Sequence, residues 1–213
     1  GVLKKAKKIA MENEQFMEIN NILNRERTLA RYMLDADGFG SVVERVHNEQ
    51  NENLEKLKNL TDVNDLGNRI TILLQKYPTS KTRDVGEKKE RNKVFNDPLL
   101  NDENKMLSSI TLKRFYNLNV VLKEWEGDLK ASLKFAKKYA DEVEKAVRNN
   151  RTTLHEFIIA QYSVLTSSGR THNMELYETA YNKLANFQTR FPDASERDRL
   201  EASYMLGLSV FSA

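Results

Sequence analysis

The chain is poor in the residues that build compact sites and tight turns. Its 213 residues include no Cys, three His, three Pro and eight Gly. The lack of Cys excludes disulfides, thiolate zinc sites and cysteine nucleophiles. Gly and Pro are too scarce for a β-sandwich or β-barrel, which needs many turns. No apolar run reaches the ~18 residues of a membrane-spanning helix, so we expect no transmembrane segment.

The two chain ends carry little targeting information. The first ten residues contain four Lys and lack the apolar core and small-residue cleavage site of a secretory signal. We therefore expect a cytoplasmic or intravirion location. Residues 209–213 stop inside an apolar helical pattern. Either this last helix docks on the core or the polypeptide continues, and we favour the second interpretation.

Apolar residues recur at three- and four-residue spacing, as in amphipathic helices. In the first part of the chain five of them are seven residues apart and predict one long helix over 2–34: Val2, Ile9, Phe16, Leu23 and Ala30. The segment 35–40, with two Gly, is expected to end this helix.

Further boundaries come from capping patterns in the first half. Ser41 and Glu44 form a capping box that predicts a second helix to about Leu60. Thr61 and Asp62 are expected to start a third, short helix, which Pro78 would end. Residues 79–93 contain a single apolar residue, Val85, and many charges of both signs, so an exposed linker or long loop is expected over 79–97.

The second half predicts four more helices. A long one over about 107–146 contains Gly127 at a possible bend, and Thr153 with Glu156 caps the next, 154–166. Two others cover about 174–191 and 200–211, separated by Pro192. We therefore expect an all-α fold of about seven helices in a bundle or helical-hairpin arrangement, without a sheet. The organisation would be 1–76, a charged linker over 77–105 with a helix start at Asp97-Pro98, and 106–213.

One local pattern resembles a known repeat family. Ala180, Leu184, Phe187 and Pro192 have the spacing of the second helix and closing proline of a tetratricopeptide repeat, and residues 204–207 are similar to the start of a following repeat. The resemblance covers about 176–211 and implies partner or peptide binding. No second copy occurs at a period near 34 residues, and a generic helical hairpin explains the same residues.

Catalytic and metal-binding motifs are incomplete. Glu44 and His47 have the spacing of a di-iron helix, but the chain lacks a second copy and the additional glutamates. Asp35 to Gly38 is similar to the start of a calcium loop, yet Val46 stands where its bidentate Glu should be. No Ser occupies a nucleophile context. We expect no enzymatic activity, no metal centre and no cofactor.

The distribution of charge, and of Lys in particular, is the remaining indication of function in the sequence. The net charge is +3 overall and alternates between +3, −4, +2, +3 and −1 over 1–34, 35–75, 76–105, 106–150 and 151–213. This alternation suggests packing between complementary protein surfaces more than a polyanion partner. Two clusters are candidates for contact with phosphates or an acidic partner: Lys4, Lys5, Lys7 and Lys8, and Lys130, Lys134, Lys137 and Lys138.

These observations favour two functions. The first is a non-enzymatic structural or assembly protein that acts through protein–protein contacts or self-association, with a phage or virion component as one version. High Asn and Lys content agrees with an AT-rich genome such as those of some phages. The alternative is a nucleic-acid-associated helical protein that uses its Lys clusters.

Overall fold

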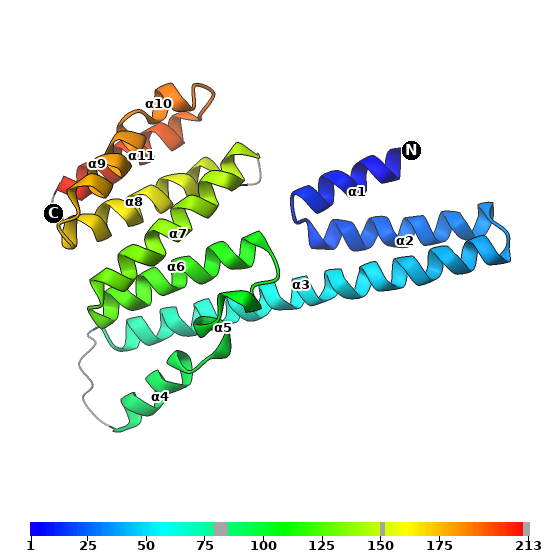
Figure 1. Cartoon of the computed structure of the whole chain (residues 1–213), viewed down its shortest axis with the longest axis horizontal. Coiled ribbons are helices and arrows are strands. Elements are labelled where there is room, and N and C mark those ends of the chain that lie inside the picture. Colours follow the sequence, from blue (N-terminus) through cyan, green and yellow to red (C-terminus); the bar gives the residue numbers. More distant parts are fainter. Residues whose placement is uncertain (79–84, 150–151, 211–213) are drawn as a thin grey trace. The chain divides into compact units, whose positions relative to one another are not determined.

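The fold is all-helical, as the sequence predicts. A computed structural model describes residues 1–78, 85–149 and 152–210, which form eleven α-helices and one 3₁₀ helix, without a strand in these ranges (Figure 1). The number of helices is larger than the expected seven, because three expected helices are broken and the expected linker contains helices, although two expected helices are joined in one. Contacts divide the chain into unit 1, Gly1–Leu66 with Asp102–Leu112, and unit 2, Gly67–Asn101 with Lys113–Ala213.

Unit 1 begins with a helical hairpin, so the prediction of one helix over 2–34 was wrong. Helix α1 (Val2–Glu12) and helix α2 (Phe16–Met33) are separated by a tight turn. Glu14 in that turn has a φ of 51°, the left-handed region that ends a helix. The turn also divides the expected seven-residue stripe, so Leu23 is buried while Val2 and Ile9 are exposed.

Helix α3 (Ala36–Lys76) is 41 residues long and replaces two expected helices. Asp35, expected within a break, instead caps α3, since its Oδ1 accepts a hydrogen bond from the Gly38 backbone N–H at 2.9 Å. Ser41 and Thr61, expected to start helices, donate from their hydroxyls to the carbonyls of Asp37 and Leu57. Hydroxyls can bond the preceding turn in this way without ending a helix.

The core of unit 1 joins its first three helices. The buried members come from α1, α2 and α3: Ala10, Phe16, Ile19, Ile22, Leu23 and Val46. Half-buried Leu57 and Leu60 of α3 pack against them. Buried Asn53 of α3 donates a hydrogen bond from its side-chain amide to the Phe16 carbonyl at 2.7 Å, which satisfies a polar group in an apolar setting.

Unit 2 contains a series of packed helices. Helix α7 (Leu129–Arg148) packs on α8 (Leu154–Arg170), which packs on α9 (Met174–Ala185), and α11 (Glu196–Val210) contacts both α8 and α9. The short α10 (Phe187–Arg190) follows a break after α9, so the expected helix 174–191 is divided. Residues 211–213, at the end of the last expected helix, lie outside the described residues.

The helix expected over 107–146 is two helices. Helix α6 (Ser109–Glu126) ends at Gly127, whose φ of 82° belongs to the left-handed region. Asp128 then caps α7, because its side chain accepts from the Ala131 N–H at 3.1 Å. The predicted cap at Thr153 is confirmed: its hydroxyl accepts from the Glu156 N–H at 3.2 Å.

The segment 77–105 was expected to be a charged linker or long loop, but most of its described part is helical. It contains α4 (Val85–Phe95), α5 (Pro98–Asn101) and the 3₁₀ helix η1 (Glu103–Lys105). Residues 79–84, part of the same expectation, lie outside the described residues. The predicted helix start at Asp97 is confirmed by a 2.9 Å bond from the Leu99 N–H to its Oδ1.

Helix α4 is ordered by paired charges and an aromatic partner. Arg91 forms a buried ion pair with Glu87 and lies 4.3 Å from the ring centre of Trp125. Trp125 also packs against Phe95 and donates from Nε1 to the Tyr77 carbonyl at 3.0 Å. The charges that suggested a linker are therefore partly satisfied within the helix, which composition alone does not show.

Candidate functional site

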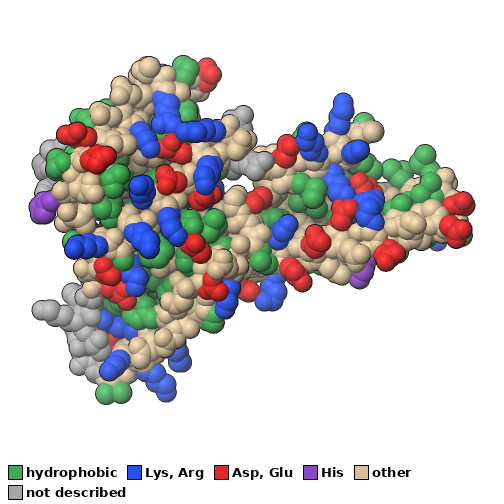
Figure 2. Space-filling model, in the orientation of Figure 1, with side chains coloured by type: hydrophobic (Ala, Val, Ile, Leu, Met, Phe, Trp, Pro, Cys, Tyr) green, Lys and Arg blue, Asp and Glu red, His purple; other side chains and the backbone are tan. Residues whose placement is uncertain are grey.

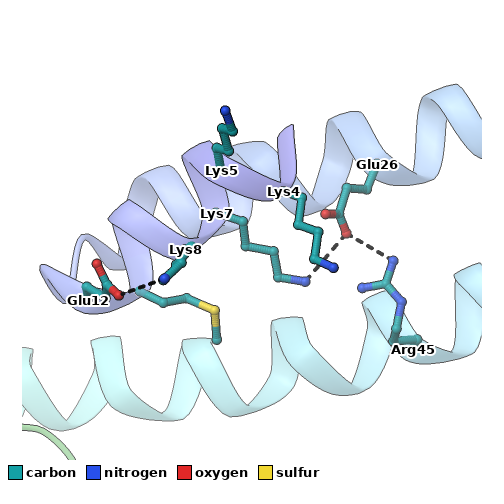
Figure 3. A pocket seen from close by; sticks show the side chains of 8 residues that line it. Lys4, Lys5, Lys7, Lys8, Glu12, Glu26 and Arg45 are labelled. Atoms are coloured by element: carbon teal, nitrogen blue, oxygen red, sulfur yellow. Dashed lines mark hydrogen bonds and ion pairs between the residues drawn. The ribbon is translucent and has the colours of Figure 1, made fainter. Parts of the chain in front are cut away.

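The first Lys cluster lies on α1, and its members have different roles. Lys7 is half-buried and reaches Glu26 of α2 and Glu49 of α3. Arg45 of α3 pairs with the same two carboxylates, at 3.0 Å to Glu26 and 2.7 Å to Glu49. These four side chains form a closed ring of ion pairs that links the three helices of unit 1, and Figure 3 shows Lys7 and Arg45 converging on Glu26.

The ring shifts the pKa of Glu49 and of Arg45. Burial alone would raise the pKa of Glu49, but hydrogen bonds from Lys7 and Arg45 outweigh it and lower the pKa below the ordinary value. The hydrogen bond to Glu49 is the main reason that the pKa of Arg45 is raised. Lys7 is thus a structural cation, already neutralised by neighbours.

The other α1 lysines, Lys4, Lys5 and Lys8, are exposed. No ion pair to Lys4 or Lys5 occurs in the described part of the chain. Lys5 points away from the ring, whereas Lys8 approaches Glu12 at 3.8 Å (Figure 3). A groove of about 690 Å³ runs beside them, lined by Lys4, Lys5, Lys7, Lys8, Met11, Glu12, Glu26 and Arg45. The aliphatic Lys stems and Met11 give it an apolar lining, with ammonium groups at its edge.

The second Lys cluster lies on the outer face of α7. Lys130, Lys134 and Lys137 are exposed on one side, while Ala136 and Tyr139 face the core of unit 2. The spacing predicted this shared face, and the structure brings the three side chains there. Lys138 differs: it is half-buried, with its ammonium 5.3 Å from the ring centre of Tyr116.

A carboxylate on the same helix gathers several cations. Glu144 contacts Lys183 of α9, Arg190 of α10 at 3.4 Å and Arg148 at 3.7 Å. It also accepts a hydrogen bond from buried Gln161 of α8 at 3.1 Å. Burial raises the pKa of Glu144, but Lys183 and Arg190 lower it by a larger amount. This cluster links α7 with α8, α9 and α10 inside unit 2.

An apolar surface at the end of α2 was not found from the sequence. Tyr32 and Met33 are 79% and 76% exposed, and Leu29 and Leu34 are about half exposed beside them. We call these four residues the apolar tip. Ala30 is buried, and Tyr32, two residues and roughly 200° farther around the helix, points the opposite way. Met33 follows buried Ala30 by three residues, the spacing of a shared helix face, so the sequence alone does not reveal its exposure.

Figure 2 shows hydrophobic side chains gathered over the end of the α2–α3 hairpin. Elsewhere on the visible face, basic and acidic side chains are intermingled and form no uniformly basic surface. Among the described residues, no group of three or more His, Asp or Glu is placed to hold a metal ion. None of the helices in those ranges is long and apolar enough to cross a bilayer.

Comparison with known proteins gives no relatives. No protein-family model, no curated protein and no solved structure matches the chain. The resemblance of 176–211 to a tetratricopeptide repeat therefore gains no support from relatives, although Ala180, Leu184 and Phe187 are buried as a helical hairpin requires.

Proposed function

We propose that the chain is a non-enzymatic helical protein that works through protein–protein contacts as a structural or assembly component, for which a virion or phage particle is one setting. The apolar tip carries this proposal. Four large apolar side chains are adjacent, and two of them are more than three-quarters exposed. Tyr and Met are enriched in protein interfaces, and contiguous exposed apolar surface marks interaction sites.

Charged surroundings make the apolar tip suitable for a protein partner. Arg27 and Arg31 are exposed on the same helix, and Asp35 and Asp37 follow directly at the start of α3. An apolar centre with a rim of both charge signs is the usual anatomy of a protein interface. The mixed rim supports a protein partner over a polyanion.

The test is concentration-dependent light scattering of the purified chain. We expect species heavier than the 24.7 kDa monomer at micromolar concentration. The double variant Tyr32→Ser/Met33→Ser should weaken association by at least tenfold, because it removes two exposed anchors from the contact. Met17→Ser is the matched control, since Met17 is an exposed methionine on the same helix outside the apolar tip.

Two results would count against the proposal. A chain that stays monomeric with every variant, or an assembly that Tyr32→Ser/Met33→Ser leaves intact, would contradict contact through the apolar tip. Circular dichroism of each variant should show unchanged helicity. This check separates a lost contact from a lost fold.

The second candidate is association with nucleic acid through α7. It is favoured by one observation: Lys130, Lys134 and Lys137 share an exposed face on a single helix. Lysines in such a row can contact successive phosphates, and the affinity should then fall steeply with salt.

A matched pair of charge reversals tests this candidate. Reversing Lys130, Lys134 and Lys137 to Glu should reduce the affinity for duplex or single-stranded DNA and flatten its salt dependence. The control reverses Lys88, Lys89 and Lys93 of α4, which are also exposed, so both variants change the net charge equally. Equal loss in both variants would indicate a non-specific charge effect and dismiss α7 as the site.

A further inference from the structure

The groove beside α1 keeps a positive charge after the ion pairs along it are considered. The ring of ion pairs is neutral, because its two cations face two carboxylates. Lys8 has Glu12 at 3.8 Å. Lys4 and Lys5 are exposed, and neither has an ion pair within the described residues. The groove therefore has two uncompensated ammonium groups at its edge, and it complements a negative charge.

The lining of the groove is mainly hydrocarbon. Its volume of about 690 Å³ lies within the range of small-molecule sites. Met11 lines it together with Lys4 and Lys8, whose aliphatic stems carry a charge only at their tips. Glu26 and Arg45 also line it, and they already pair with each other at 3.0 Å. A hydrocarbon chain in the groove therefore removes apolar surface from water without leaving a polar group of the groove unpaired.

The side chains along α1 give the groove a direction. Lys4 and Met11 are seven residues apart, which places them on nearly the same side of the helix and about 10 Å apart along its axis. Figure 3 shows Lys4 extending from α1 in the same direction as Lys7, whereas Lys5 points away. Glu12 directly follows Met11 and repels an anion at that end. An anionic group is therefore favoured at Lys4, with an apolar chain toward Met11.

A peptide fits the groove less well than a hydrocarbon chain. An extended peptide brings backbone N–H groups that need acceptors, and the carboxylates that line the groove, Glu12 and Glu26, already face cations. An α-helix satisfies its own backbone, but it is about 10 Å across, and 690 Å³ is less than the volume of two of its turns. A single hydrocarbon chain needs neither acceptors nor that width.

We infer that the groove beside α1 binds one long-chain fatty acid, with its carboxylate at the Lys4 ammonium and its chain along the aliphatic lining toward Met11. The carboxylate accepts a charge-assisted hydrogen bond from Lys4. Burial of the chain provides most of the affinity. The groove and the apolar tip are formed by different residues, so this inference goes beyond the proposed function and does not depend on it.

Isothermal titration calorimetry with dodecanoate, below its micelle concentration, tests the site. We expect saturable binding of one molecule per chain, and weaker binding of dodecanol, which has the same chain without the charge. Lys4→Gln should reduce the affinity for dodecanoate by about fivefold, the upper range for an exposed ion pair, and should affect dodecanol less. Met11→Ser should reduce the affinity for both ligands by about fivefold, because it removes apolar lining.

Matched controls separate the groove from general effects of charge and hydrophobicity. Lys88→Gln on α4 and Met17→Ser on α2 replace exposed residues outside the groove and should leave binding unchanged. Tyr32→Ser/Met33→Ser should leave it unchanged as well. Loss of binding in that variant, with normal binding in Lys4→Gln and Met11→Ser, would place the ligand on the apolar tip and overturn the groove site. Circular dichroism of each variant should show unchanged helicity.

Three further results would overturn the inference. They are the absence of saturable dodecanoate binding, equal binding of dodecylammonium, which shows that the lysines do not select the charge, and binding to anionic phosphatidylglycerol vesicles without binding of dodecanoate. The last result would assign the lysines to a membrane surface instead. A chain that binds dodecanoate but stays monomeric would retain the groove site and contradict only the proposed function.

Discussion

The carboxylate of Glu14, in the turn between α1 and α2, caps the first turn of α6 at Ser109. Its Oε1 accepts from the Ser109 backbone N–H at 2.8 Å, and its Oε2 accepts from the Ser109 hydroxyl at 2.9 Å. The Ile110 N–H donates to Oε2 at 2.9 Å as well. A residue distant in sequence thus satisfies helix N–H groups that have no intrahelical partner.

Removing this cap should destabilise unit 1. We expect Glu14→Ala to lower its free energy of unfolding by about 1–2 kcal/mol, the usual cost of losing a helix cap. Hydrogen exchange at the Ser109 and Ile110 amides is the direct measurement, because both lose their acceptor. Glu12→Ala is the control, since within the described residues the ion pair of Glu12 is an exposed contact with Lys8 at 3.8 Å. Unchanged protection in Glu14→Ala would contradict the capping role.

Glycine at the same position separates the cap from the backbone. Glu14→Gly also removes the carboxylate but accepts the φ of 51° without strain. It should therefore be less destabilising than Glu14→Ala by about 1 kcal/mol, the penalty of a left-handed residue with a side chain. Urea unfolding of the two variants measures the difference. An equal loss would show that the turn stores little strain.

Unit 1 should be less stable at acidic pH, because Glu49 becomes protonated. Its pKa is lower in the folded chain than the ordinary value of 4.5. The ionised carboxylate therefore stabilises the fold above that value, and the contribution is lost as the pH falls below it and through the lowered pKa. Glu49→Gln should reduce this pH dependence in guanidinium unfolding followed by circular dichroism. Glu18→Gln, on the exposed face of α2, should keep the wild-type slope.

Unit 2 should depend on Glu144 far more than on Arg148. Glu144→Ala leaves Lys183 and Arg190 without their shared carboxylate and should cost about 1–3 kcal/mol. Arg148→Ala removes a 75% exposed side chain at 3.7 Å and should cost less than about 1 kcal/mol. Thermal unfolding of both variants checks the contrast. Similar losses of stability in the two variants would mean that the ion pairs of Glu144 act through surface charge alone.

Two glycines should respond to alanine with opposite signs. Gly127 has a φ of 82°, so Gly127→Ala strains the break between α6 and α7 by about 1–2 kcal/mol although nothing lies within 4 Å of the added Cβ. Gly207, inside α11, also has open space around it. Gly207→Ala should stabilise by about 0.5–1 kcal/mol through helix propensity. Calorimetry of the pair measures the sign directly, and loss of stability in both would refute the distinction.

Local signals were sufficient for the fold class and for some boundaries. Apolar periodicity predicted an all-helical chain, and the caps at Asp97 and Thr153 are present. The helix starts predicted at Ser41 and Thr61 were wrong, because a Ser or Thr hydroxyl can either cap a helix or donate to a carbonyl of the preceding turn inside one. Which bond forms depends on tertiary packing of α3, and nothing near either residue in the sequence reveals it.

The candidate sites were also predicted only in part from the sequence. The sequence located both Lys clusters, and Lys130, Lys134 and Lys137 do share a face. It did not show that Lys7 is neutralised, because its partners lie on α2 and α3, up to 42 residues away. Nor did it show the exposure of Met33, because an apolar residue three positions after buried Ala30 has the spacing of a core residue.

Because Trp125 packs against α4, its fluorescence reports whether this helix is in place. It is the only Trp in the sequence, and its indole contacts Arg91 and Phe95 and donates to the Tyr77 carbonyl. Its fluorescence should therefore shift to the red when α4 leaves the indole and water replaces it. All of these contacts belong to unit 2. Melting of the α1–α2 hairpin, which has no indole, would be silent in the same spectrum.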